Sequence, residues 1–424
     1  MNGIILFRYC QYPFSPQKQS GTAPLKERAM KKDAGKDPLR IAIIGHKRIP
    51  SNEGGIEKGV EEHAVRMVAR GHDVVVYNRG DDHINGKAYN SERLKTYKGV
   101  KIVTVPTPRH ASVPIYSFLA TVHAIFRRYD VISYRASGPC VMLALAKLFG
   151  TRCVASLHGF DSQRDKWGKF AKWYLAQGER IAATRADACL VLSEKMRRYI
   201  RDTYGAEAIC FANGIDKPEN LPPRLIAEKW GLEKDSYLLS LGRIEPEKGL
   251  HYLIEAFRAS RTDKKLVIAG GDSNHRYFQQ LQEMAAGDER IQFVGYVSGD
   301  VTRELYSNAY MFLLPSNLEG MANTLLESMS YGNCCLVSDI AENTEVTGDF
   351  AEIFPKGDVA ALQKKLQGLL DDPDRVARMK AQTAEYILSR YNWDIVVDQM
   401  LRIYRGERVD YQTVLREHRE KSGV

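Results

Sequence analysis

Two glutamates, Glu319 and Glu327, stand eight positions apart in the segment SNLEGMANTLLESMSYGNCCLVSD. The segment follows an apolar run, Met311–Leu314, that is typical of a buried strand, and its own apolar residues then recur at helical spacing. We therefore expect Glu319 in the turn before a helix and Glu327 inside that helix. The free N–H groups and the dipole at a helix start favour an anionic ligand, and carboxylates accept hydrogen bonds from sugar hydroxyls. The pattern suits a ligand with a sugar at one end, phosphate in the middle and a ribose at the other.

A second segment, SLGRIEPEKGL, joins an apolar strand, Tyr237–Leu241, to a predicted helix, His251–Phe257. Gly242 lets the chain turn away from the strand, and Arg243 and Lys248 then stand on either side of the strand-to-helix crevice, where open α/β sheets bind ligands. Arginine can bind phosphate through two parallel hydrogen bonds, and lysine supplies a mobile charge. The alternative is a solvated loop with ordinary surface charges.

A third segment contains Gly54 and Gly55, between the predicted strand Leu39–Ile44 and the predicted helix Lys58–Arg70. It has no G-x-G-x-x-G pattern, so the dinucleotide-binding fingerprint is absent. Two glycines at a helix start allow close backbone approach to a ligand, although a flexible turn is the simpler interpretation.

A fourth candidate is His158, which follows the predicted strand Arg152–Leu157 and precedes Gly159 and Asp161. A side chain at the carboxyl end of such a strand faces the ligand-binding edge of the sheet. A single histidine is more often structural than catalytic, but this position favours a functional role.

Together, these motifs resemble those of retaining family 4 glycosyltransferases of the GT-B type, which have two Rossmann-like domains. The Glu-x7-Glu segment resembles their donor site, and the Gly-Arg…Lys-Gly segment resembles their diphosphate-binding loop. The stretches GGIEKGVEEHAVRMVARGHDVVVYNR and HGFDSQRDKWGKFAKWYL resemble a bacterial polysaccharide subgroup that includes rhamnosyltransferases.

The resemblance implies retaining transfer of a hexosyl or rhamnosyl group from a nucleotide sugar to a glycan or lipid-linked glycan, in cell-surface polysaccharide synthesis. We expect a UDP- or dTDP-linked donor. No DxD stands in a convincing metal site, so we expect neither metal nor cofactor, with arginine and lysine supplying the positive charge. The expected catalytic residues are His158, Arg243, Lys248 and Glu319; the other expected donor-binding residues are Gly54, Gly55, Gly242, Gly320, Met321, Ala322 and Glu327; the acceptor-side candidate is Asp161.

The chain of 424 residues is long enough for two domains, and apolar strands alternate with helical segments throughout. We therefore predict an α/β protein with two Rossmann-like, doubly wound domains facing a cleft. We expect residues 1–38 to be either a disordered basic extension or an over-called start, with Met30 as the alternative initiator. We expect residues 39–215 to bind the acceptor and residues 216–391 to bind the nucleotide sugar. Residues 392–424 form a last helix and a loosely held charged tail. That helix either crosses back to the first domain or caps the second sheet, and the sequence leaves both open.

The net charge is +9, and many of the cations lie in the first half, where Trp167, Phe170 and Trp173 stand among them. A solvated face, a nucleic-acid surface and an anionic membrane surface are the three interpretations. We see no nucleic-acid-binding module and favour the membrane surface, because basic residues among aromatic ones suit an interfacial helix. No apolar stretch reaches the roughly 18 residues that a spanning helix needs. The seven cysteines lack metal-ligand spacing and suggest reduced thiols. We expect a cytoplasmic protein, peripheral at the inner face of the membrane.

Two other classes stay open. One is a GT-B sugar-nucleotide epimerase or phosphorylase, which would use a similar nucleotide site. The other is a non-catalytic relative that binds membrane or nucleic acid.

Overall fold

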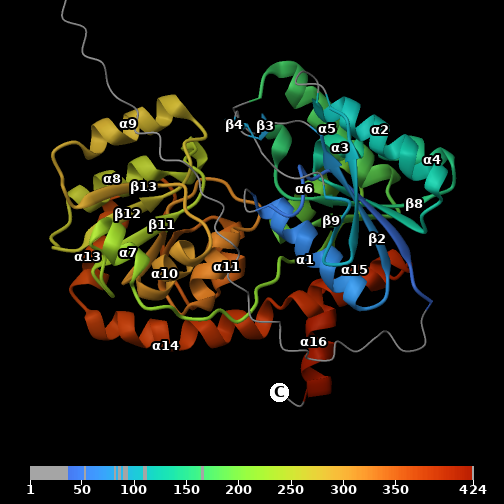
Figure 1. Ribbon diagram of the computed structural model, residues 1–424. Helices are drawn as coiled ribbons and strands as arrows, with labels where there is room; N and C mark the ends of the chain where they lie inside the picture. The colour runs from blue at the N-terminus through green and yellow to red at the C-terminus, as the bar shows by residue number, and fades with distance from the viewer. Residues whose placement is uncertain are drawn as a thin grey trace, which may run out of the picture.

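The computed structural model describes residues 37–51, 54–80, 83–84, 87–88, 94–107, 112–163 and 167–422. Two separate sheets, each flanked by helices, form two α/β domains that lie beside one another (Figure 1). The prediction of two Rossmann-like domains is confirmed. The expected extension, residues 1–38, lies outside the described residues except for its last two positions.

The first sheet has the strand order β10-β9-β8-β7-β1-β2-β6-β5, in which every described pair is parallel except β5 with β6. Its strands are β1 (Arg40–Ile44), β2 (Asp73–Arg79), β5 (Thr96–Tyr97), β6 (Val100–Val105), β7 (Val131–Arg135), β8 (Arg152–Leu157), β9 (Ala188–Val191) and β10 (Ile209–Cys210), and β3 (His83–Ile84) pairs with β4 (Lys87–Ala88) separately. The helices of this domain are α1 (Gly55–Ala69), α2 (Ser112–Arg127), α3 (Ser137–Cys140), α4 (Leu143–Leu148), α5 (Lys169–Arg185) and α6 (Glu194–Tyr204).

The second sheet is fully parallel, with the order β13-β12-β11-β14-β15-β16. Its strands are β11 (Tyr237–Leu241), β12 (Lys265–Ala269), β13 (Ile291–Gly295), β14 (Met311–Leu314), β15 (Cys334–Ser338) and β16 (Glu352–Phe354). Its helices are α7 (Leu225–Trp230), α8 (Leu250–Arg258), α9 (His275–Ala285), α10 (Asp300–Asn308), α11 (Asn323–Ser330), α12 (Ala341–Thr347), α13 (Val359–Leu370) and α14 (Pro373–Arg390).

The central strands are buried on both faces: every residue of β7 and of β15 is buried. Strands of this kind are continuously apolar because helices cover both sides of a parallel sheet. In each sheet the strand order reverses once, between β1 and β7 and between β11 and β14. Loops that leave the carboxyl ends of strands at such a reversal form the binding edge of open α/β sheets. These positions fix where the predicted site residues lie.

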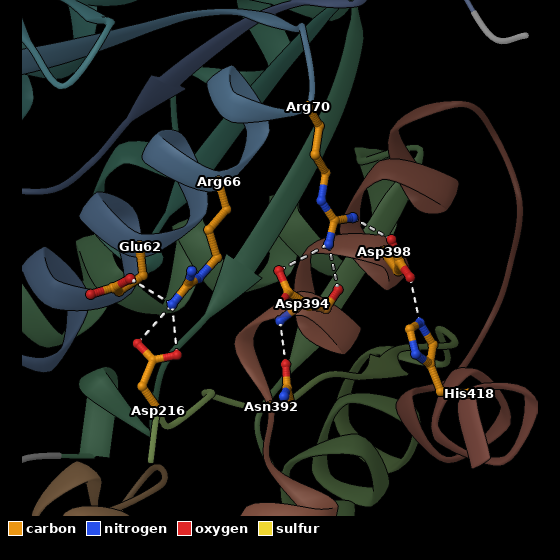
Figure 2. A network of polar contacts seen from close by, with 8 residues as sticks. All are labelled: Glu62, Arg66, Arg70, Asp216, Asn392, Asp394, Asp398 and His418. Atoms are coloured by element: carbon orange, nitrogen blue, oxygen red, sulfur yellow. Dashed lines mark hydrogen bonds and ion pairs between the residues drawn. The ribbon is translucent and has the colours of Figure 1, made fainter. Parts of the chain in front are cut away.

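The chain passes between the domains twice, and the two crossing segments touch. Ile215 and Asn392 form a parallel bridge, and the Ile215 N–H donates to the Tyr391 carbonyl oxygen at 2.8 Å. Helix α15 (Trp393–Tyr404) then lies against α1 of the first domain. Arg66 and Arg70 of α1 bind Asp216, Asp394 and Asp398 around this crossing (Figure 2).

The last helix, α16 (Tyr411–Ser422), packs against α15. Tyr411, Val414 and Leu415 are buried against the core that α15 belongs to. The expectation of a loosely held tail is therefore wrong for residues 411–422. Some of the charged residues that suggested it are exposed, and others pair with α15, as Glu417 does with Arg402 and His418 with Asp398. Across the part of the chain that the structure describes, no helix has the length and apolar character to span a membrane.

Candidate active site

Glu319 lies in the turn between β14 and α11, as its sequence position predicts, and its carboxylate is buried. Lys248, from the short helix Pro246–Lys248 after β11, donates to its Oε1 atom at 2.5 Å, and the Ser316 hydroxyl donates to the same oxygen at 2.6 Å. The two loops meet because β11 and β14 are neighbours in the sheet. The structure thus brings together the predicted lysine and the predicted sugar-binding carboxylate as an ion pair.

Glu327 lies in α11, and both of its carboxylate oxygens are engaged. The Tyr306 hydroxyl of α10 donates to Oε2 at 3.2 Å, and the Lys58 ammonium of α1 pairs with Oε1. Burial by itself lowers the pKa of Lys58, but the Glu327 carboxylate more than offsets burial, and the pKa is raised. Lys58 was not among the residues predicted from the sequence, because its partner lies in the other domain.

Arg243 follows Gly242 at the end of β11 and is about half exposed, with its guanidinium 3.9 Å from the Glu245 carboxylate. Met321 and Ala322 complete the turn into α11, where Ala322 is the N-cap residue and is buried. Free N–H groups at a helix start and the charges of Arg243 and Lys248 together suit an anionic ligand beside this turn.

The first domain touches the same turn. A Cβ atom placed on Gly320 would lie 2.0 Å from the backbone oxygen of His158, so only glycine allows this approach. Asn213 donates to the Asn323 side chain at 2.7 Å, and its backbone N–H contacts the Met321 sulfur at 3.2 Å. His158 and Gly320, predicted separately from the two halves of the sequence, are in direct backbone contact.

The turn before α1 also meets α11. A Cβ atom on Gly55 would lie 2.9 Å from the Asn323 side-chain nitrogen. Gly54, the N-cap residue, leaves room for the Glu57 carboxylate, which folds back and accepts from the Lys47 N–H at 3.0 Å. The Gly54–Gly55 turn is therefore held by Glu57 and lies against the start of α11.

His158 follows β8, and its imidazole packs edge-on to Phe211 with the ring centroids 5.6 Å apart. Its Nε2 atom is buried and has no hydrogen-bond partner among the described residues. Burial, helped by the charge of Arg135, lowers the pKa of His158 to about 3. The imidazole is therefore neutral near pH 7 and can donate or accept one hydrogen bond toward a ligand.

Arg135, at the end of β7, is a buried cation that the sequence reasoning missed. It donates to the Ser156 hydroxyl at 3.3 Å and the Tyr404 hydroxyl at 3.4 Å, and it lies 3.3 Å from the His63 ring nitrogen. Burial lowers its pKa. Because it stands inside a buried strand, no motif marked it.

Asp161, the acceptor-side candidate, lies in the turn after His158, with one carboxylate oxygen 3.5 Å from the Ser137 hydroxyl. Beside it, the buried Glu179 of α5 accepts from the Ser162 N–H at 3.2 Å and from the Ser162 hydroxyl at 3.0 Å. Asp161 is thus on the first domain, in a turn anchored by Glu179. Within the described ranges, no three histidine, cysteine, aspartate or glutamate side chains gather as a metal site.

The two domains match two family models in succession. Residues 53–217 match the model described as Glycosyltransferase Family 4, and residues 224–386 match the model described as Glycosyl transferases group 1. Among characterised relatives, the glycogen synthase of Mycobacterium tuberculosis is 24% identical, over 87% of this chain and 96% of that protein. The phosphatidyl-myo-inositol mannosyltransferase of Mycobacterium leprae is 26% identical, over 83% and 92%.

Among solved structures, Anabaena HepE in complex with UDP and glucose has a TM-score of 0.72 at 15% identity, covering 87% of this chain and all of that one. At this identity the likeness concerns the fold.

Proposed function

Since the chain belongs to the GT-B glycosyltransferases, we propose that it moves a sugar from a nucleotide sugar to a glycan or lipid-linked glycan, with retention of anomeric configuration. The observation that supports this most directly is the start of α11. There a carboxylate stands on either side of a helix N-terminus, a lysine is paired with the first carboxylate, and the backbone of His158 reaches the same turn from the other domain.

Each part of this arrangement has a task in the proposed reaction. Arg243 and Lys248, with the N–H groups at the start of α11, stabilise the charge that develops on the departing diphosphate. Glu327 binds the ribose hydroxyls, and Glu319 binds the transferred sugar. The neutral imidazole of His158 bonds a sugar hydroxyl from the opposite side, which aligns the anomeric carbon for attack.

We also propose that the reaction needs no metal and no cofactor, because Arg243 and Lys248 supply the cationic charge that a divalent metal provides in other transferases. For the donor, a UDP- or dTDP-linked hexose or rhamnose is our first choice. The likeness to a UDP-bound fold and the polysaccharide-subgroup motifs around Gly55 and His158 support it. Asp161 is the candidate for contact with the acceptor.

A cytoplasmic enzyme that acts on a lipid-linked acceptor would also contact the inner face of the membrane, and the outer side of the first domain suits such a contact. Helices α2, α4 and α5 lie together there (Figure 1). The side chains of Phe126, Leu148, Phe149, Phe170 and Trp173 are 57–82% exposed on them. Arg127, Lys169 and Lys172 belong to the same helices, so an anionic lipid surface is the partner whose chemistry matches.

The test is a panel of nucleotide sugars, scored by nucleotide release with and without a lipid-linked glycan extract. We expect one donor to be used in an acceptor-dependent way, with activity retained in excess EDTA and lost in Arg243→Ala. Release that depends on inorganic phosphate would indicate a phosphorylase. Complete loss on chelation, restored by Mg²⁺ or Mn²⁺, would contradict metal independence.

A further inference from the structure

Lys58 connects the first domain to the carboxylate that we assign to the ribose. It lies in the first turn of α1, and its ammonium pairs with Glu327 on α11 of the second domain. Other ion pairs of α1 and of its C-cap residue Arg70 lie elsewhere. Glu61 pairs with Lys98, and Arg66 binds Asp216 in the crossing segment. Arg70 binds Asp394 and Asp398 of α15 (Figure 2). The Lys58 end of α1 therefore faces the donor site, and the Arg70 end faces the crossing.

Both oxygens of the Glu327 carboxylate already accept a hydrogen bond in this arrangement. Lys58 donates to Oε1 and the Tyr306 hydroxyl donates to Oε2. Each carboxylate oxygen can accept a second hydrogen bond. Ribose hydroxyls that bind Glu327 would therefore either share it with the Lys58 ammonium or replace the ammonium on Oε1.

Lys58 is the partner that can move. The Tyr306 side chain is buried at 2% exposure and stacks on Tyr331, with the ring centroids 5.4 Å apart. The side chain of Lys58 is 42% exposed, and that of Glu327 is 21% exposed. An ion pair that water reaches contributes little to stability, so exchanging it for ribose hydroxyls costs little.

We propose that Lys58 is a further residue of the donor site: its ammonium occupies the ribose-binding oxygen of Glu327 in the donor-free protein and is displaced when the nucleotide binds. The inference rests on the proposed function, because it takes Glu327 as the ribose ligand. It adds a consequence, which is that donor binding removes an ion pair between the domains. A second such pair, between Lys195 of α6 and the buried Glu342 of α12 at 3.0 Å, stays in place.

Titration calorimetry with UDP, dTDP and GDP on the full chain tests this. Lys58→Met should bind its preferred nucleoside diphosphate about two- to five-fold more tightly than the wild type, since the competitor for Glu327 is gone. Lys58→Arg keeps a cation in place and should bind as the wild type does. Lys195→Met, which removes the other interdomain pair, is the matched control and should leave nucleotide affinity unchanged.

A double-mutant cycle gives the sharper readout. In Glu327→Gln, adding Lys58→Met should change nucleotide affinity by less than about 1.5-fold, because the two residues act through one contact.

If Lys58→Met binds the nucleotide no more tightly than the wild type does, the proposed role of Lys58 is wrong and the proposed function is not affected. The same holds if Lys58→Met raises nucleotide affinity equally in the Glu327→Gln background. Lack of any nucleoside diphosphate binding by the wild type would overturn the proposed function as well, and thermal melting of each variant shows whether it is folded.

Discussion

At the scale of single residues, the pairing of Lys248 with Glu319 changes what each side chain is expected to do. The exposed fractions of the two side chains are 16% and 8%, whereas the Arg243 side chain is 45% exposed. Lys248 thus has a buried structural partner, whereas Arg243 makes, among the described residues, only a long contact with Glu245 at 3.9 Å and is open to a ligand from solvent. The two cations, equivalent in the sequence motif, differ in their contribution to stability.

Arg243→Ala and Lys248→Ala should therefore separate in thermal melting. Both should lose about 2–4 kcal/mol of transition-state stabilisation, as when an oxyanion donor is removed. Only Lys248→Ala should also lose about 1–3 kcal/mol of folding stability, because it leaves the buried Glu319 carboxylate without its cation and with the Ser316 hydroxyl as the remaining donor described for it. Adding Glu319→Gln to Lys248→Ala should recover part of that stability. Equal melting temperatures for the two single variants would contradict this account of the pair.

The two glutamates should differ in kinetics. Glu327 is assigned to the ribose, which binds alike in ground and transition states, so Glu327→Gln should raise KM and weaken binding of the free nucleoside diphosphate. Glu319 is assigned to the sugar, where alignment at the anomeric carbon matters, so Glu319→Gln should mainly lower kcat. Calorimetry with the nucleoside diphosphate on both variants decides which glutamate binds the ribose and which binds the sugar. Weaker nucleotide binding in Glu319→Gln than in Glu327→Gln would mean that the motif runs the other way.

His46, His63 and His158 of the first domain should make the protein sensitive to acid. Burial lowers the pKa of His158 to about 3 and of His46 to about 4, and it places the pKa of His63 well below its usual value of 6.5. Between about pH 6.5 and 4 the unfolded chain then binds more protons than the folded one, so stability falls as the pH falls through this window. Urea midpoints measured from pH 7 to 4 check this. His158→Gln should show a shallower decline, and a slope identical to that of the wild type would contradict a neutral His158.

At the scale of elements, apolar runs alone placed the parallel strands nearly to the residue. The predicted strand Leu39–Ile44 is Arg40–Ile44 in the structure, and the predicted helix His251–Phe257 is Leu250–Arg258. Such runs are read reliably because both faces of these strands are covered. No apolar run in the sequence marks the position of Glu57 in the first turn of α1 or the exposed face of α16, so neither could be predicted in this way.

What the sequence could not supply are contacts made across the domains. The Glu-x7-Glu spacing predicted Glu319 in a turn and Glu327 in a helix, and both are found there. The partner of Glu319 comes from the same domain, and the partner of Glu327 comes from the other domain. Lys248 is near Glu319 because two strands are neighbours, whereas Lys58 reaches Glu327 only through the arrangement of the two domains. No periodicity within one element encodes the second kind of contact.

Helix α16 gives a prediction at this scale. Tyr411, Val414 and Leu415 form its apolar stripe, at spacings of three and four, which the surrounding charges obscured in the sequence. Leu415→Ala should lower the free energy of unfolding by about 2–4 kcal/mol, as for other buried leucines. The neighbouring exposed Arg416→Ala is the control and should stay within about 0.5 kcal/mol of the wild type. Similar denaturation midpoints for the two variants would mean that α16 contributes no packing energy.

At the scale of the whole molecule, the domains are joined by the crossing segments and also meet at the donor turn, which Asn213 contacts two residues before Ile215 of the crossing. Around the crossing, Arg66 binds both carboxylate oxygens of Asp216 at 2.8 and 2.7 Å (Figure 2). Gly214 packs directly against Trp393. At the donor turn the contacts include the Lys58–Glu327 ion pair, the Asn213–Asn323 hydrogen bond and the approach of Gly320 to the His158 backbone.

A single methyl group on Gly320 would block the close approach of the donor turn to the His158 backbone. In Gly320→Ala the new Cβ atom would lie 2.0 Å from the His158 backbone oxygen and 3.0 Å from its carbonyl carbon, and neither is the end of a flexible side chain. The two domains must therefore separate at the donor turn. A displacement of about 1 Å at a reacting centre can cost on the order of 100-fold in rate, so turnover should fall by about that much. Affinity for the free nucleoside diphosphate should change far less, because Arg243, Lys248 and Glu327, which are assigned to the diphosphate and the ribose, lie in the second domain. Gly168→Ala, whose added Cβ meets nothing within 4 Å, is the matched control and should retain full turnover.

Wild-type turnover in Gly320→Ala would show that catalysis does not need the contact between this turn and His158. Loss of nucleotide binding equal to the loss of turnover would instead place the damage in the second domain alone.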